Sequence, residues 1–222
     1  MRRPFPEARP PSIRDFMAFE EHLRGARART GREVPPAWYQ LPVFYFSNPG
    51  AIYADGDDIP KPTDTAKLDY ELELACVIGD GGEPEGFTIM NDFSARDLQA
   101  LEMPVGLGPA KGKDFATALG PELVSADELP DDLDMIAVAR VNGEERTRSR
   151  TGGMHWTWPQ LLAAAARNTP GLLPGDVIGS GTVGRGCILE AGDERWLEPG
   201  DVVELEIEGI GVLRNRIVAA RP

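Results

Sequence analysis

Two glutamates, Glu71 and Glu73, are separated by a single residue in the run Leu68-Asp-Tyr-Glu-Leu-Glu-Leu74. In a β-strand, side chains two residues apart lie on one face, so these carboxylates would project together while the apolar residues of the run face the other way. Repulsion between the two charges must be offset, and a divalent cation that accepts oxygen from both groups does so directly. The pair predicts either a cation site or a solvent-facing acidic stripe.

A third acid, Asp92, stands where the apolar segment 87–91 gives way to Phe93-Ser-Ala-Arg-Asp-Leu-Gln99. Functional residues gather at such ends of strands, and the position therefore favours the cation site. Hard cations prefer oxygen ligands, and the scarcity of His and Cys in this chain leaves no zinc cage. We expect Mg²⁺, with Mn²⁺ or Ca²⁺ as alternatives.

Histidine occurs at two positions, His22 and His155, so few groups can transfer a proton near neutral pH. Asp15 and His22 are seven residues apart and share a face if their segment is helical, which would place an acid and a base along one wall of a cleft. A single histidine on a helix can equally be structural. The aromatic run around His155, Met154-His-Trp-Thr-Trp-Pro, is typical of packing.

The elements that must position these residues are expected to be mostly strands, because 25 Gly and 20 Pro indicate many turns. Four prolines in residues 1–11 exclude a regular helix there, and we expect an extended surface arm that precedes a structured part starting at Ser12. Turns are expected at 47–50, at 56–62 and at Asn142-Gly143, the last within a hairpin. Helices are expected at 12–25 and 161–168, and strands at about 38–46, 68–78, 87–91, 122–124, 135–141, 177–178, 187–189 and 202–207.

The chain has 222 residues, a length that suits one catalytic domain over residues 12–222. Its formal net charge of −13 argues against a nucleic-acid partner, which requires clustered Lys and Arg. No apolar stretch approaches the roughly 18 residues that span a bilayer, and no signal core is seen, so we expect no membrane partner. Cys76 and Cys187 lie in apolar runs, which argues against a disulfide and fits a cytoplasmic location.

The ordered motifs of this chain resemble the fumarylacetoacetate hydrolase family from Asp15 onward. The resemblance implies a mixed β-sandwich roll of the family's catalytic-domain type, mostly β (α+β) with a few short helices, and a homodimer. By the same resemblance, we expect this chain to be mostly the catalytic domain, without the small N-terminal β-domain of longer members. The matching stretches are Asp15-Phe-Met-Ala-Phe-Glu-Glu-His22, Leu68-Asp-Tyr-Glu-Leu-Glu-Leu74, Met90-Asn-Asp-Phe-Ser-Ala-Arg-Asp-Leu-Gln99, Gly112-Lys-Asp-Phe-Ala-Thr117, and Gly179-Ser-Gly-Thr182 followed by Gly186-Cys-Ile-Leu-Glu190.

The resemblance also implies a role for each matching residue. His22 would be the base that activates water, oriented by Glu190, because a carboxylate that accepts one imidazole N–H leaves the other nitrogen free to take a proton. Lys113 would stabilise an enolate as a C–C bond breaks, with Gln99 beside it. The metal ligands would be Asp15, Glu71, Glu73 and Asp92, with Thr117 at the metal, and the substrate contacts would be Tyr45, Arg96 and Thr182.

The activity implied by the resemblance is hydrolysis of a C–C bond in a 1,3-diketone or acylpyruvate-type (2,4-dioxo acid) substrate, as in the catabolism of aromatic compounds. It would use His/Glu-activated water and a metal-stabilised enolate. One alternative is decarboxylation or isomerisation of a 2-oxo acid, such as oxaloacetate or an unsaturated oxo-diacid, within the same family. Another alternative is a non-catalytic metal-binding β-domain.

Two departures from the family leave the substrate open. A second substrate-contacting tyrosine of longer members falls at Met103, and the loop that carries their substrate-binding arginine is shorter here. Arg29 or Arg32 is the candidate equivalent of that arginine. Together with Arg24 and Arg27 these residues form a basic cluster, which we expect to be mostly a solvated loop.

Overall fold

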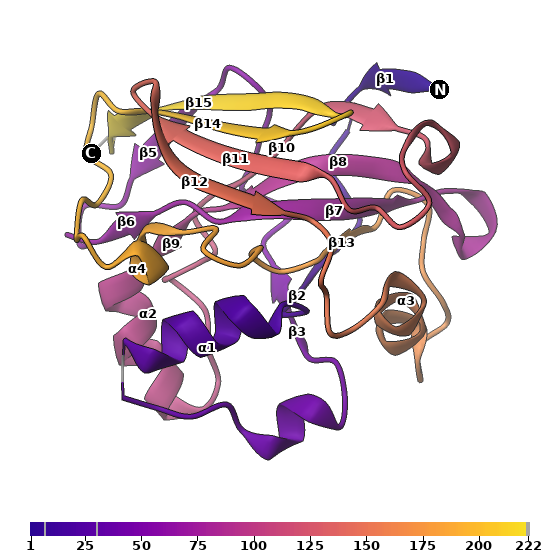
Figure 1. Ribbon diagram of the computed structural model, residues 1–222, viewed down its shortest axis with the longest axis horizontal. Helices are drawn as coiled ribbons and strands as arrows, with labels where there is room; N and C mark the ends of the chain where they lie inside the picture. Colours follow the sequence, from indigo (N-terminus) through magenta and orange to yellow (C-terminus); the bar gives the residue numbers. More distant parts are fainter. Residues whose placement is uncertain (7, 30, 221–222) are drawn as a thin grey trace.

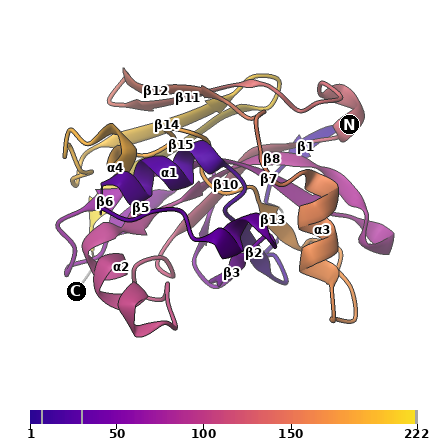
Figure 2. The same cartoon turned by 60° about the horizontal axis from the view of Figure 1, so that its bottom comes forward.

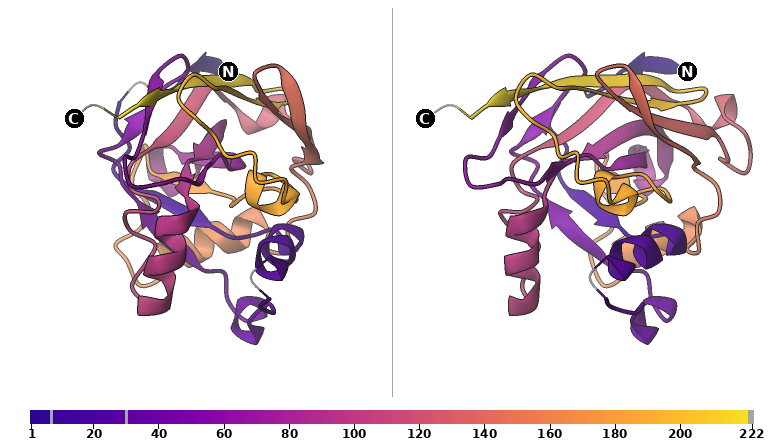
Figure 3. Two further views of the ribbon diagram at one scale, coloured as in Figure 1. Left: turned by 90° about the vertical axis from the view of Figure 1, so that its left-hand side faces the viewer. Right: turned by 60° about the vertical axis from the view of Figure 1, so that its left-hand side comes forward.

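The computed structural model describes residues 1–6, 8–29 and 31–220. It is mostly β with a few short helices, as predicted: an eight-stranded sheet and a five-stranded sheet face each other, and a two-stranded ribbon lies at one end (Figure 1). Helices α1, α2 and α4 gather on one side of the molecule, and α3 lies apart from them (Figures 2 and 3). Among the described residues, no helix has the length and apolarity needed to cross a bilayer.

The large sheet has the strand order β1-β10-β8-β7-β13-β2-β3, with β4 paired to β10. Its strands are β1 (Arg2–Pro4), β2 (Ile13–Phe16), β3 (Phe44–Ser47), β4 (Ile52–Tyr53), β7 (Leu72–Ile78), β8 (Pro84–Asp92), β10 (Thr117–Val124) and β13 (Val177–Gly179). The small sheet, in the order β12-β11-β14-β15-β5, consists of β5 (Asp58–Lys61), β11 (Ile136–Val141), β12 (Glu144–Arg150), β14 (Val202–Ile207) and β15 (Gly211–Ala219).

The ribbon pairs β6 (Leu68–Asp69) with β9 (Ser94–Ala95). The α-helices are α1 (Glu20–Ala28), α2 (Arg96–Glu102), α3 (Trp158–Ala166) and α4 (Ile188–Ala191). Single turns of 3-10 helix occur at Pro36–Tyr39, Asp80–Gly82, Met103–Val105 and Ala126–Glu128.

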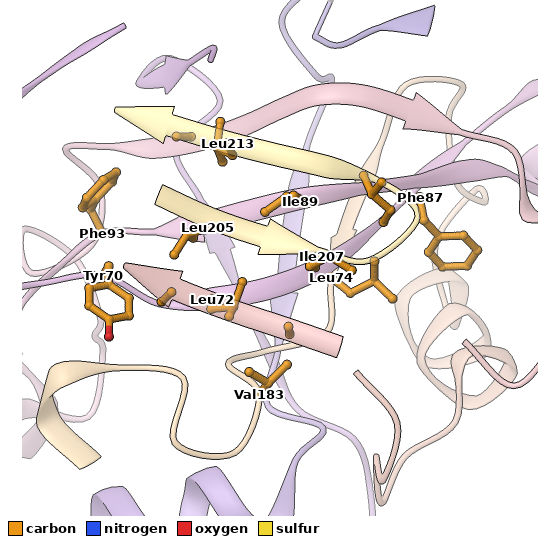
Figure 4. Close-up of a cluster of buried hydrophobic side chains, with 14 of the residues drawn as sticks. Tyr70, Leu72, Leu74, Phe87, Ile89, Phe93, Val183, Leu205, Ile207 and Leu213 are labelled. Carbon is orange, nitrogen blue, oxygen red and sulfur yellow. The ribbon is translucent and has the colours of Figure 1, made fainter. Parts of the chain in front are cut away.

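The main apolar core lies between the two sheets (Figure 4). Tyr70, Leu72 and Leu74 point into it, as the period of two predicted, and pack with Leu205 and Leu213 of the small sheet. Every residue of β7 is buried, because its other face is also covered. Burial on both faces explains why this strand reads as an almost continuous apolar run in sequence.

The other face of the large sheet has two different ends, and this division positions the site. One end carries a second, smaller apolar cluster that includes Ile13, Ala75, Met90 and Leu119. Because side chains alternate, moving two residues along each of these strands places a polar group on the same face at the opposite end. These polar residues are Asp15 on β2, Glu73 on β7, Asp92 on β8 and Thr117 on β10.

The prediction of one helix over residues 12–25 is wrong. Residues Ile13–Phe16 form β2, which pairs in parallel with β13 and antiparallel with β3, and the helix begins only at Glu20. Pairing with β3 and with the distant strand β13, more than 150 residues away, overrides the local spacing that suggested a helix. Asp15 and His22 therefore do not share a helix face.

The N-terminal segment is extended, as expected, but it is more than a surface arm. Residues Arg2–Pro4 pair with β10 as the edge strand β1, and Phe5 is buried in the second apolar cluster. Ordered structure therefore starts before Ser12.

Three further predictions of local structure are wrong. The segment 38–46 begins within a 3-10 turn and becomes a strand only at Phe44, and the expected turn at 56–62 contains β5. The expected strand at 187–189 is instead the start of α4. The last strand, β15, was not predicted.

Several local predictions are confirmed. Asn142 and Gly143 adopt φ values of 53° and 79° between β11 and β12, the left-handed pair that a two-residue hairpin turn requires. The second predicted helix is α3, which begins with a capping box of Thr157 and Gln160. The ring of His155 packs against aromatic rings, 4.8 Å from that of Trp38 between centroids, and both cysteines are free.

Candidate metal centre and water-activating dyad

Three carboxylates from three strands, β2, β7 and β8, converge at the polar end of the large sheet. Asp15, Glu73 and Asp92 each offer an oxygen, and these oxygens all lie within 4.8 Å of one another. All three side chains are buried, Glu73 and Asp92 completely. We call these residues the carboxylate cluster.

Burial is the largest cause of a raised pKa at every member of the carboxylate cluster. Repulsion adds to it: Asp92 raises the pKa of Asp15, and Asp15 raises that of Glu73. Within the described part of the chain, Asp15 Oδ1 and Asp92 Oδ1 are buried with no hydrogen-bond partner. The cluster therefore holds more negative charge and more acceptor capacity than its own surroundings satisfy.

These residues fit a hard divalent cation. Bonds of about 2.0–2.6 Å from such an ion to oxygen allow two ligand oxygens to lie at most roughly 4–5 Å apart, which matches the spread of the cluster. The donors are carboxylate oxygens, the ligands that Mg²⁺ and Mn²⁺ accept, and two of them are unsatisfied.

Glu71 lies outside that group of three, in surroundings of opposite charge. Arg96 Nη2 donates to its Oε1 at 2.6 Å, and Lys113 donates to its Oε2. Burial alone would raise the pKa of Glu71, but Arg96 and Lys113 outweigh it and hold the pKa far below its ordinary value. Arg96 also donates to Asp69 at 2.8 Å and to Gln99 at 3.1 Å. We call these five residues the ion-pair network.

Lys113 joins the ion-pair network to the carboxylate cluster, because its ammonium group also donates to Asp92. Burial would lower its pKa, but Asp92 and Glu71 raise it above the ordinary value, so the side chain stays cationic. Tyr45 of β3 donates its hydroxyl to the same Asp92 oxygen at 2.6 Å. Thr117 lies directly opposite Asp92 in the register of β8 and β10, with its hydroxyl 2.9 Å from that of Ser47.

Glycines at the end of β13 and in the segment after it allow the backbone to approach the carboxylate cluster. Gly181 has a φ of 80°, and its N–H donates to Glu73 Oε2 at 3.2 Å. A side chain at Gly181 would collide with the backbone of Phe16 and Met17, and one at Gly179 would collide with the carboxylate of Asp15. Thr182 Oγ1, 3.4 Å from Glu73 Oε1, completes the contacts from this segment.

A histidine and a glutamate face each other across helices α1 and α4. His22 Nδ1 lies 2.7 Å from Glu190 Oε2, and both side chains are buried. The backbone N–H of Arg185 donates to the other oxygen of Glu190 at 3.0 Å. An ionised Glu190 accepts the proton of Nδ1, which leaves Nε2 as the nitrogen able to accept a proton. The two helices pack closely, since a Cβ at Gly25 would lie 2.7 Å from Glu190 Oε1.

One cavity of about 410 Å³ is lined both by residues of the carboxylate cluster and by His22. Met103 also lies in its wall. Nine of the residues predicted from sequence line the cavity: Asp15, His22, Tyr45, Glu71, Glu73, Arg96, Gln99, Lys113 and Thr182. Of the other three, Asp92 contacts Lys113 and Tyr45 of these walls, Glu190 contacts His22, and Thr117 lies opposite Asp92 on β10.

A second cavity of about 810 Å³ adjoins the first and shares Arg96, Gln99, Met103 and Leu189 with it. Arg29, Arg32 and Lys67 give this cavity a basic lining. Arg29 already donates to the backbone carbonyls of Glu190 and Ala191, at 2.8 and 3.2 Å.

Asp69 is the principal residue that sequence reasoning missed. It is fully buried beside the site, where it pairs with Arg96 in the ion-pair network and accepts a backbone N–H of α4. A signal was present, because Asp69, Glu71 and Glu73 follow one another at a spacing of two. The partners that give Asp69 its place come from distant segments, and no local pattern reveals them.

The profile described as Fumarylacetoacetate (FAA) hydrolase C-terminal matches residues 12–218. A fumarylacetoacetase of Arabidopsis thaliana is 30% identical over 79% of this chain, and the match spans only 57% of that protein's length. A mitochondrial oxaloacetate tautomerase of Bos taurus is 34% identical over 91% of this chain and 64% of its own. Among solved structures, a fumarylpyruvate hydrolase from Pseudomonas aeruginosa, in complex with Mn²⁺ and pyruvate, has the same fold, with a TM-score of 0.75, 24% identity, and coverage of 97% of this chain and 98% of its own.

Proposed function

The chain belongs to the fumarylacetoacetate hydrolase family, and from this premise we propose that it is a divalent-metal-dependent hydrolase that cleaves a C–C bond in a 1,3-diketone or acylpyruvate-type substrate. One observation carries the choice of hydrolysis. His22 lines the same cavity as Asp15 and Glu73, and the buried Glu190 contacts it from behind, which is the arrangement that activation of water requires.

The carboxylate cluster, with Glu71 beside it, is the proposed site of the cation, and Mg²⁺ is the expected ion with Mn²⁺ or Ca²⁺ as alternatives. A cation bound there supplies a Lewis acid for the carbonyl oxygens of the substrate. Raised carboxyl pKa values keep protons in the cluster until a cation displaces them. Thr117, which packs beside Asp92, would support this side of the site.

The chain's own residues divide the remaining work. His22 takes a proton from water at Nε2, while Glu190 stabilises the imidazolium that forms. The resulting hydroxide adds to a carbonyl carbon, the bond to the neighbouring carbon breaks, and its electron pair leaves as an enolate that is then protonated. Lys113 and Arg96 place positive charge where that negative charge develops, and Gln99 is held beside them by Arg96.

Substrate binding is proposed to extend from the small cavity into the large one. Tyr45 and Thr182 would contact the end of the substrate nearest the carboxylate cluster. Because Arg29 is occupied by two backbone carbonyls of α4, we favour Arg32 over Arg29 as the arginine that meets the far end of the substrate. A homodimer and a cytoplasmic location remain predictions.

The main alternative is tautomerisation or isomerisation of a 2-oxo acid at the same site. The relation to the Bos taurus oxaloacetate tautomerase favours this alternative as much as the Arabidopsis relative favours hydrolysis. The two reactions differ in their need for water, and therefore in their need for Glu190.

The test is turnover of a panel of acylpyruvates, fumarylacetoacetate-like diketones and oxaloacetate, with Mg²⁺ or Mn²⁺ and with a chelator. We expect metal-dependent C–C hydrolysis that falls by about 10³-fold in Glu190→Gln while metal binding persists. Glu21→Gln, the same change at an exposed neighbour of His22, is the matched control and should keep full activity. Hydrolysis that survives Glu190→Gln would remove the dyad from the mechanism, and enol–keto exchange of oxaloacetate without hydrolysis would favour the alternative.

A further inference from the structure

We propose that Asp69 is a positioning residue for the His22–Glu190 dyad, because its single carboxylate holds both the first turn of α4 and the side chain of Arg96. This inference rests on the proposed function, since it concerns the same dyad. It assigns a role to a residue that touches neither the cavity nor the proposed cation site.

The side chain of Asp69 accepts three hydrogen bonds from described residues that flank the site. Its Oδ1 accepts the backbone N–H of Ile188 at 2.7 Å, and its Oδ2 accepts that of Leu189 at 3.1 Å. The same Oδ2 accepts Arg96 Nε at 2.8 Å. The side chain is 0% exposed, so no water competes for these contacts.

Helix α4 depends on such contacts, because it consists of a single turn. Helix nucleation is unfavourable, and four residues cannot maintain a helix by their own hydrogen bonds. The first N–H groups of any helix need external acceptors, and the residue at the N-cap, Cys187, supplies no side-chain cap. Asp69 of β6 accepts these N–H groups instead. Glu190 lies on this turn, so its carboxylate is positioned by the anchor.

The other end of α4 is held by Arg29 through the carbonyls of Glu190 and Ala191. The turn is therefore fixed at both ends by side chains from other elements, one of which also fixes Arg96. In this arrangement Asp69 couples the ion-pair network to the orientation of Glu190, and Glu190 in turn selects the tautomer of His22.

Asparagine cannot replace this carboxylate. Asp69 meets three donors with two oxygens, whereas an amide offers one oxygen and two further N–H groups. Asp69→Asn therefore leaves at least one donor of α4 or Arg96 facing another donor, and α4 should lose its fixed position relative to His22.

The test measures the tautomer of His22 directly by NMR of the imidazole nitrogens in protein labelled with ¹⁵N-histidine, and it needs no substrate. The sequence has two histidines, and a His155→Gln variant assigns their signals. We expect His22 to carry its proton on Nδ1 in the wild type and to become a mixture of both tautomers in Asp69→Asn. A single Nδ1–H tautomer in Asp69→Asn would overturn the proposal, whether or not the protein proves to be a hydrolase.

Asp97→Asn is the matched control. Asp97 accepts the hydroxyl of Thr65 and the backbone N–H of Ala66 and Leu98, so its loss also removes local hydrogen bonds, but it touches neither α4 nor the dyad. We expect Asp97→Asn to leave the His22 tautomer unchanged. A tautomer mixture in both variants would mean that general loosening is the cause, which would also overturn the proposal.

If Asp69→Asn does not fold, the tautomer of His22 is measured in Ile188→Pro instead. Proline removes one N–H that Asp69 accepts while keeping every charge, and it suits the first helical position after the extended Cys187. A shift toward the second tautomer supports the proposal, and an unchanged tautomer overturns it. Where turnover is available, Asp69→Asn should lower kcat by about 100-fold in the wild-type background and have no further effect in Glu190→Gln. Additive losses would contradict action through Glu190.

Discussion

Glu71 and Glu73 differ only in their surroundings, although they lie two residues apart, point to the same side of the chain and are both buried. Arg96 and Lys113 neutralise Glu71 and hold its pKa far below the ordinary range. Glu73 meets a backbone N–H, a hydroxyl and two further carboxylates, and burial together with repulsion from Asp15 raises its pKa. The charges of the ion-pair network balance one another, whereas the carboxylate cluster has an excess of negative charge.

The different surroundings of Glu71 and Glu73 explain how one face of the large sheet can hold so many acidic residues. Glu71 is stabilised by cations that belong to the chain, which lower its pKa and favour its charged form without a bound ion. The charges of the carboxylate cluster are compensated only in part, by Lys113 at Asp92, and the remainder can be satisfied by protons or by a bound cation. The charge of Glu71 is therefore balanced by the chain itself, whereas the charge of the carboxylate cluster depends on the protons or the cation bound there.

Replacing either glutamate with glutamine tests this difference, and the larger loss of stability is expected at Glu71. In Glu71→Gln, the amide can accept from only one of the two buried cations, and the other loses one of its two carboxylate partners. We expect the free energy of unfolding to fall by about 3 kcal/mol, the low end of the range for a broken buried pair, because Asp69 and Asp92 each retain one cation. Urea unfolding followed by tryptophan fluorescence in the presence of a chelator measures this loss.

Glu73→Gln should have the opposite profile. Glutamine resembles the protonated acid that the raised pKa favours, so we expect the metal-free stability to stay within about 1 kcal/mol of wild type. Loss of a charged ligand should weaken Mn²⁺ binding by about 100-fold or more, as measured by titration calorimetry. Equal Mn²⁺ affinity in wild type and Glu73→Gln would show that the carboxylate cluster is not the cation site.

The positions of these acids could be predicted from the sequence, but their surroundings could not. Alternation along a strand is a local property, so the shared face of Glu71 and Glu73 and the position of Asp92 at the end of a strand could be predicted. What neutralises Glu71 could not, because Arg96 comes from the start of α2 and Lys113 from the loop before β10.

The same limit explains the error at the N-terminus. The spacing in residues 12–25 favours a helix locally, but pairing of Ile13–Phe16 with Val177–Gly179 is non-local and decides the outcome. That pairing brings Asp15 to the carboxylate cluster from β2, while His22 reaches the site from a separate helix. The predicted roles of these residues came from family resemblance rather than from the incorrect helix.

The pH dependence of metal stabilisation offers a smaller and graded test of the comparison. In the folded, metal-free protein the pKa values of Asp15 and Glu73 are raised, whereas in the unfolded chain they return to about 4. Above pH 4 the folded state therefore binds more protons than the unfolded state, and metal-free stability is lost as the pH rises through the folded values. Glu71 has a lowered pKa and contributes the opposite sign, with stability that is lost only on acidification.

A bound cation displaces the protons of the cluster, so Mg²⁺ should stabilise the protein more as the pH rises from 5 to 8. We expect its apparent affinity to rise by up to about tenfold per pH unit for each proton displaced, within the range where Asp15 and Glu73 titrate. Thermal unfolding with and without Mg²⁺ at a series of pH values measures this directly. In Glu73→Gln one displaceable proton is gone, and the slope should be shallower. Mg²⁺ stabilisation that is the same at pH 5 and pH 8 would mean that the cluster is already ionised without metal, and the contrast between Glu71 and Glu73 would then lie in hydrogen bonding alone.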